Sequence, residues 1–181
     1  MGLRLMRAAS LARRLFELTG VALGPLLIVW CLAPSRALAI AALIVVAVHA
    51  GYGLTVIARA HPNNGSYGGL RNWTFLLERA TGALLIGYLA FYLWTTRPAL
   101  SLSPALLHAR YFGIEALWLH LLGLAMLAFH FCNGAIGAAI HNGLLVSRRA
   151  QRSAGAVAAL VAIALFAAAA TPLFALYRSG R

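Results

Sequence analysis

Long apolar stretches, separated by short polar or proline-containing segments, occupy most of this chain. Each is about 20 residues long, the length that an α-helix needs to cross the hydrocarbon core of a bilayer. Within lipid, a single continuous segment satisfies its backbone N–H and C=O groups only as a helix. The sequence therefore predicts an all-α integral membrane protein. We expect one transmembrane domain over residues 1–181, a bundle of five helices spanning the membrane at about 15–33, 36–58, 74–96, 112–142 and 154–177.

Charged residues are scarce, and the basic ones are all arginine. Charged side chains make up 10% of the 181 residues and leave a net charge of +12. Such a charge can indicate nucleic-acid binding, but these arginines are spread between the apolar stretches instead of forming one patch. Arginines between spans are typical of loops in membrane proteins. We therefore expect membrane lipid, and no nucleic acid, among the partners.

The positions of the arginines also predict an orientation. Five spans place the two termini on opposite sides of the membrane. With a cytoplasmic N-terminus, the inner side carries Arg4, Arg7, Arg13, Arg14, Arg59, Arg71, Arg79, Arg148, Arg149 and Arg152, and the outer side carries Arg36, Arg97, Arg110, Arg178 and Arg181. Because arginine accumulates on the cytoplasmic side, this orientation is favoured.

The first apolar stretch has a second interpretation. Its basic flank, its apolar centre and the small residues Ala37-Leu-Ala39 are also typical of a cleaved signal peptide. The next apolar stretch follows almost at once, which fits a tight helical hairpin better.

Two histidines, His49 and His130, lie inside apolar stretches of different spans. An unpaired polar group is costly to bury, and an ionisable residue within a span marks a candidate functional site. At 1.5 Å per residue, His49 lies roughly 13 Å and His130 roughly 17 Å from the inner ends of their helices. This matched depth suits a haem iron held between two imidazoles. Two unrelated core histidines would show the same spacing, so both interpretations stay open.

Other polar residues are expected near the inner surface. They are Arg14, Tyr52, Arg71, Arg79 and His141. His141 follows His130 by eleven residues, which returns it to the same helix face. Each of these residues is also consistent with an ordinary interfacial anchor. His120 lies in the outer half of its span, where no second histidine accompanies it.

The first and third spans share a sequence pattern. Thr19-Gly20 is followed ten residues after the glycine by Trp30, and Thr81-Gly82 is followed at the same distance by Tyr92. The two spans run in the same direction, so Trp30 and Tyr92 are expected at the same outer level.

With these motifs, residues 12–150 resemble the membrane-anchor cytochrome b subunit of succinate dehydrogenase and fumarate reductase, of the five-span, single-polypeptide type. The motifs are Leu18-Thr-Gly, His49-Ala-Gly-Tyr-Gly, Ala58-Arg-Ala-His-Pro, Ser66-Tyr-Gly, Glu78-Arg-Ala-Thr-Gly and His130-Phe-Cys-Asn-Gly. Members of this family hold two b haems with four histidines. The resemblance implies that His49 and His130 are the axial ligands of the inner haem.

The outer histidine pair of the family is missing here. Trp30 and Tyr92 stand on the two spans that carry it, and neither side chain is a usual haem ligand in such a site. We therefore expect one haem b, with the aromatic rings filling the volume of the second; a haem-free anchor remains the alternative.

The resemblance implies a subunit that performs no bond-making of its own. It would anchor iron–sulfur and flavoprotein subunits on the cytoplasmic side of a bacterial or archaeal plasma membrane. It would also hold haem b and part of a quinone site, and pass electrons between the iron–sulfur subunit and quinone. The inner-side candidates for contacts with the quinone or with a haem propionate are Arg14, Tyr52, Arg71, Arg79 and His141. Two alternatives stay open: a cytochrome b subunit of another quinone-linked dehydrogenase or hydrogenase, and a non-redox membrane scaffold or transporter.

Overall fold

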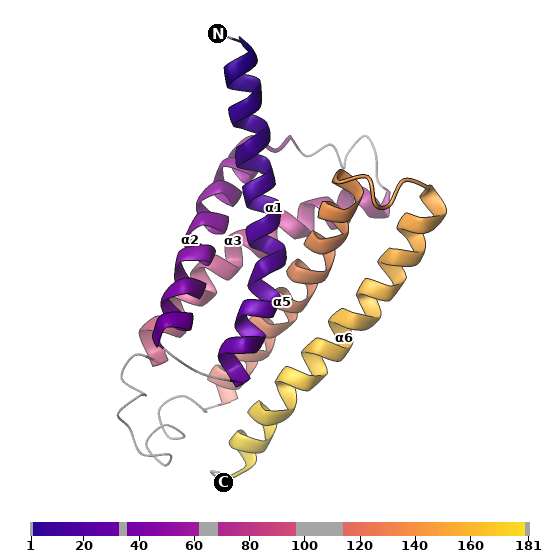
Figure 1. Ribbon diagram of the computed structural model, residues 1–181. Helices are drawn as coiled ribbons and strands as arrows, with labels where there is room; N and C mark the ends of the chain where they lie inside the picture. The colour runs from indigo at the N-terminus through magenta and orange to yellow at the C-terminus, as the bar shows by residue number, and fades with distance from the viewer. Residues whose placement is uncertain (1, 33–35, 62–68, 97–113, 180–181) are drawn as a thin grey trace. The chain divides into compact units, whose positions relative to one another are not determined.

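A computed structural model describes residues 2–32, 36–61, 69–96 and 114–179, and these residues contain helices and no strand. The helices are α1 (Gly2–Leu32), α2 (Arg36–Ala58), α3 (Leu70–Thr96), α5 (Ile114–His141) and α6 (Arg148–Ser179). In Figure 1 the colour of the helices follows their order in the chain, from indigo at the N-terminus to yellow at the C-terminus. The predicted all-α fold is confirmed for the described residues, and each of the five predicted stretches overlaps one of these helices.

Four of these helices are long and apolar enough to cross a bilayer. Their candidate spans are Ala37–Ala58, Asn72–Tyr92, Ala116–His141 and Arg148–Ala175, with mean hydropathy between 1.3 and 2.3. Large apolar side chains point outward from them, among them Ile44, Leu84, Leu122 and Leu160, as expected for surfaces that face lipid. The chain is therefore a multi-pass membrane protein. α1 is not among the four, so its crossing and the cytoplasmic N-terminus stay predictions.

Several helices extend beyond the predicted spans. α1 begins at Gly2 and α6 at Arg148, well before the predicted 15 and 154. Arginine and glutamine are good helix formers, so a helix continues past the apolar stretch into the interface. Ser147 caps α6, because its Oγ accepts a hydrogen bond from the backbone N–H of Ala150 at 3.1 Å.

The chain divides into two compact units. Unit 1 comprises Met1–Arg79 with Gly134–Val146, and unit 2 comprises Ala80–Asn133 with Ser147–Arg181. In unit 1, α1 and α2 pack side by side as an antiparallel pair (Figure 1). In unit 2, a small core forms between α5 and α6 around Leu117, Leu121 and Ala170. The single bundle expected from the sequence stays a prediction.

Gly143 ends α5 in a Schellman motif. Its φ is +74°, its N–H donates to the carbonyl of Ile140 at 3.1 Å, and the N–H of Leu144 donates to the carbonyl of Ala139 at 2.9 Å. Only glycine adopts this left-handed conformation without a steric cost.

We expect Gly143→Ala to lower the free energy of unfolding by about 1 kcal/mol. Gly137→Ala is the matched control, because Gly137 lies inside α5 and, among the described residues, an added Cβ there would meet nothing within 4 Å beyond its own helix backbone. Alanine in that helical position is expected to stabilise. Thermal unfolding of both variants tests the pair, and equal shifts of the same sign would contradict the assignment.

Candidate functional site

In unit 1, the imidazole of His49 on α2 lies against α1. Its ring stacks on Phe16 with centroids 4.5 Å apart and planes inclined by 8°. Its Nδ1 is 3.2 Å from the backbone oxygen of Phe16. A carbonyl oxygen only accepts hydrogen bonds, so Nδ1 carries the proton in this contact. The lone pair of the neutral ring is then on Nε2, the arrangement in which histidine binds a metal.

Two further residues of α1, Thr19 and Gly20, adjoin the imidazole of His49. The Thr19 hydroxyl donates to the Phe16 carbonyl at 2.9 Å, and its oxygen lies 3.4 Å from Nδ1 of His49. A Cβ on Gly20 would lie 2.8 Å from Cε1 of His49. The imidazole therefore occupies space that exists only because residue 20 has no side chain.

In unit 2, His130 on α5 has the same two neighbours from α3. Its Nδ1 is 3.3 Å from the hydroxyl oxygen of Thr81. A Cβ on Gly82 would lie 2.9 Å from its Cε1. Thr81 itself is buried.

The repeated Thr-Gly pattern thus has a structural meaning in each unit. In both, the threonine meets Nδ1 of a histidine and the glycine leaves room for its ring. We call each arrangement a Thr-Gly-His seat: Thr19, Gly20 and His49 in unit 1, and Thr81, Gly82 and His130 in unit 2. An imidazole held at Nδ1 fits an axial metal ligand, because ligating histidines almost always have their other ring nitrogen hydrogen-bonded.

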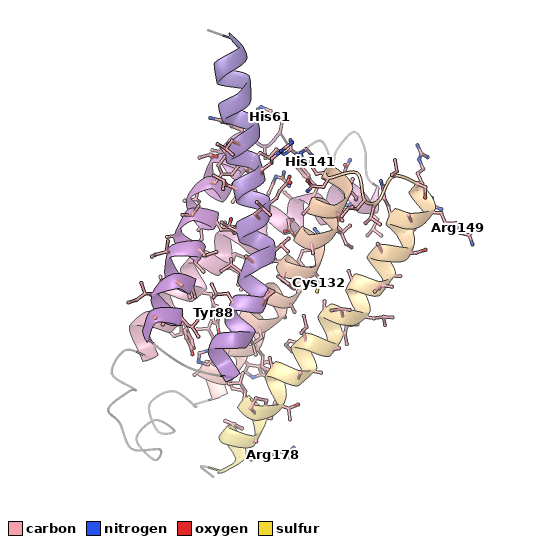
Figure 2. The ribbon with its side chains drawn as sticks, in the orientation of Figure 1. His61, Tyr88, Cys132, His141, Arg149 and Arg178 are labelled. Carbon is pink, nitrogen blue, oxygen red and sulfur yellow. The ribbon has the colours of Figure 1, made fainter. Side chains whose placement is uncertain are left out.

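Unit 2 also contains a polar aromatic cluster that was not predicted. The hydroxyl of Tyr88 (labelled in Figure 2) is 3.0 Å from Nδ1 of His120, which is 8% exposed. Tyr92 meets the same imidazole edge-on, with centroids 6.1 Å apart. Gly123 packs against the ring of Tyr88. Tyr92 thus has a histidine partner, while the side chain of Trp30 lies outside the described residues.

In unit 1, Glu17 on α1 lies close to polar side chains at the end of α5. Its carboxylate accepts from Nδ2 of Asn142 at 3.0 Å and lies 3.4 Å from Nε of Arg13. Nε2 of His141, labelled in Figure 2, is 3.6 Å away. Glu17 is the better buried partner, since its side chain is 13% exposed against 42% for His141. The imidazole of His141 therefore lies near a carboxylate, a neighbour that the sequence did not predict.

The remaining predicted contact residues have different surroundings. Tyr52 packs on Phe16, with centroids 5.1 Å apart, and so adjoins the His49 seat. The guanidinium of Arg79 lies over the Phe75 ring, 3.3 Å from its centroid, and Nη1 donates to the Phe75 carbonyl at 3.0 Å. Its Nε is buried and has no hydrogen-bond partner in the described part of the chain. Arg14 is exposed on α1, and the side chain of Arg71 lies outside the described residues.

The described helices and seats define a multi-pass helical membrane protein with imidazoles held in place inside apolar helices. The chain is similar to the succinate dehydrogenase cytochrome b558 subunit of Bacillus subtilis (strain 168), with 31% identity over 121 residues, or 65% of this chain. The matched region spans 60% of that relative's length. The resemblance predicted from the sequence is thus confirmed, and the chain is a multi-pass protein of the plasma membrane. No family model matches the chain, and no solved structure matches it.

Proposed function

We propose that the chain is the membrane-anchor subunit of a succinate:quinone oxidoreductase. In this proposal it crosses the membrane five times with a cytoplasmic N-terminus and holds one haem b and part of a quinone site. The observation that carries the proposal is the Thr-Gly-His seat, which occurs once in each unit. The similarity to a succinate dehydrogenase cytochrome b subunit supports it.

His49 and His130 are the residues that would hold the haem. Each is an imidazole within an apolar helix, and the contact of His49 with the Phe16 carbonyl leaves Nε2 as the ligating atom. A b haem held by these two imidazoles would supply one-electron transfer and would be suited to neither oxygen binding nor bond-making.

Arg79 is the strongest of the proposed contacts to a quinone carbonyl or a haem propionate. Its buried Nε–H has no hydrogen-bond partner among the described residues, and an orphaned donor of this kind is costly unless a ligand accepts from it. A guanidinium is also suited to bind a carboxylate or a polarised carbonyl. Tyr52, Arg14, Arg71 and His141 are proposed as secondary contacts.

The partners follow from the same proposal. Succinate oxidation or fumarate reduction would take place on a flavoprotein subunit, and an iron–sulfur subunit would connect it to this anchor on the cytoplasmic side. The exposed arginines at that side, such as Arg14 and Arg59, carry charge that complements acidic partner surfaces.

Purification of the tagged chain from its own membranes tests the proposal. We expect a flavoprotein and an iron–sulfur protein to co-purify, together with one haem per chain measured by the pyridine haemochrome method. Co-purification of hydrogenase or formate dehydrogenase subunits would favour another quinone-linked cytochrome b. A preparation without haem, flavin or partner subunits would indicate a scaffold or transporter, and two haems per chain would contradict the single site.

A further inference from the structure

We propose that Thr19 and Thr81 are paired positioning residues that hold Nδ1 of His49 and of His130 and thereby direct each Nε2 to the haem iron. The inference rests on the proposed haem, and it assigns a role to two side chains that are not ligands themselves. It also explains why the Thr-Gly pattern occurs twice in one chain.

In unit 1, the hydrogen bonds around Thr19 explain how it could position His49. The Thr19 hydroxyl donates its proton to the Phe16 carbonyl at 2.9 Å. Its oxygen lone pairs then face Nδ1 of His49 at 3.4 Å, and the same Nδ1 is 3.2 Å from that carbonyl. The Nδ1–H of His49 is therefore shared between two acceptors, which sets both the tautomer and the rotation of the ring.

The contact of Thr19 with His49 goes beyond the usual hydrogen bond of a helical threonine, in which the hydroxyl donates to a carbonyl of its own helix. Thr55 and Thr171 bond to carbonyls of their own helices, at 2.7 Å to Tyr52 and 2.8 Å to Ala167. Thr19 makes the same kind of bond and, in addition, meets the imidazole of a neighbouring helix. Thr81 meets His130 in the other unit at 3.3 Å. Two independent occurrences of one arrangement indicate a shared role.

The role predicts a change at the iron. Acceptors at Nδ1–H raise the basicity of the ligating imidazole, which stabilises ferric over ferrous haem. Removal of the hydroxyl should therefore raise the midpoint potential of the haem. It should also change the g-values of its ferric electron paramagnetic resonance signal, because the ring is freed to rotate.

The test uses the intact complex with Thr19→Val and Thr81→Val, which keep the shape of the side chain but remove the hydroxyl. Thr19→Ser and Thr81→Ser restore the hydroxyl and should restore both signals. Thr55→Val and Thr171→Val are matched controls, because each removes a threonine that bonds within its own helix. We expect an upward shift of the midpoint potential and altered g-values in the first two variants only.

Unchanged potentials and g-values in both valine variants would overturn the inference while leaving the haem itself in place. Equal effects of valine and serine would also overturn it, since side-chain volume and not the hydroxyl would then be responsible. If the wild-type chain holds no haem, the proposed function and the haem-directing role both fail, and ¹⁵N-histidine spectra of the haem-free chain then test the contact of Thr19 with His49 by itself. A His49 Nδ1 resonance that shifts in Thr19→Val but not in Thr55→Val supports the contact, and an unmoved resonance refutes it.

Discussion

Alanine in place of His49 or of His130 is expected to remove the low-spin spectrum of the haem almost completely. Each change deletes one of the two proposed iron–imidazole bonds, and one protein bond does not keep the iron low-spin or the haem firmly bound. Absorption spectra of the reduced complex and haem content per chain measure the effect. Added imidazole should partly restore the low-spin spectrum, because it can occupy the space that the side chain leaves.

Two other histidines serve as controls for this prediction. His61 is exposed after the end of α2, so His61→Ala should leave the spectrum unchanged. His120 is buried against Tyr88, and His120→Ala should cost stability without removing the haem. A normal spectrum in both His49→Ala and His130→Ala would refute the ligand assignment, whereas a loss only in His120→Ala would transfer it to the Tyr88 cluster.

The helices were predictable from the sequence because continuous apolar stretches have one stable backbone conformation in lipid. The stretch 36–58 coincides with α2 at both ends. The early starts of α1 and α6 were not predicted, since hydropathy marks the portion of a helix that lies in hydrocarbon and not the turns beyond it.

The candidate site was predictable only in part. His49 and His130 stood out because imidazoles are rare in apolar stretches, and the Thr-Gly pattern was visible as a repeat. The contact between the Thr-Gly pattern and the histidines was not predictable. α2 is apolar on all sides, and such a helix has no periodic pattern that marks the face packed against its neighbour. The roles of Phe16 and of the pair Tyr88–His120 were not predicted either.

Substitution of Gly20 or Gly82 by alanine is expected to weaken haem binding strongly. The new Cβ would lie 2.8 Å from Cε1 of His49, or 2.9 Å from Cε1 of His130, and carbon atoms do not approach so closely without displacement. The imidazole is a short, rigid side chain, so relief requires a shift of the ligating ring or of its helix. Overpacking of this kind costs about 1–3 kcal/mol. That cost corresponds to roughly a 5- to 150-fold loss of haem affinity, measurable by titration of haem into the depleted complex.

Two other glycines, Gly51 on the helix of His49 and Gly87 on the helix of Gly82, provide matched controls. Gly51 lies two residues beyond His49 in α2, and Gly87 follows Gly82 in α3. At both positions, an added Cβ would have no described neighbour within 4 Å apart from its own helix backbone. Gly51→Ala and Gly87→Ala should therefore bind haem normally and stabilise their helices by about 0.5–1 kcal/mol. The comparison separates the helix propensity of alanine from the space that the imidazole needs. Equal haem affinity in all four variants would show that neither glycine serves the histidine, and a loss in all four would point to a general disturbance of helix packing.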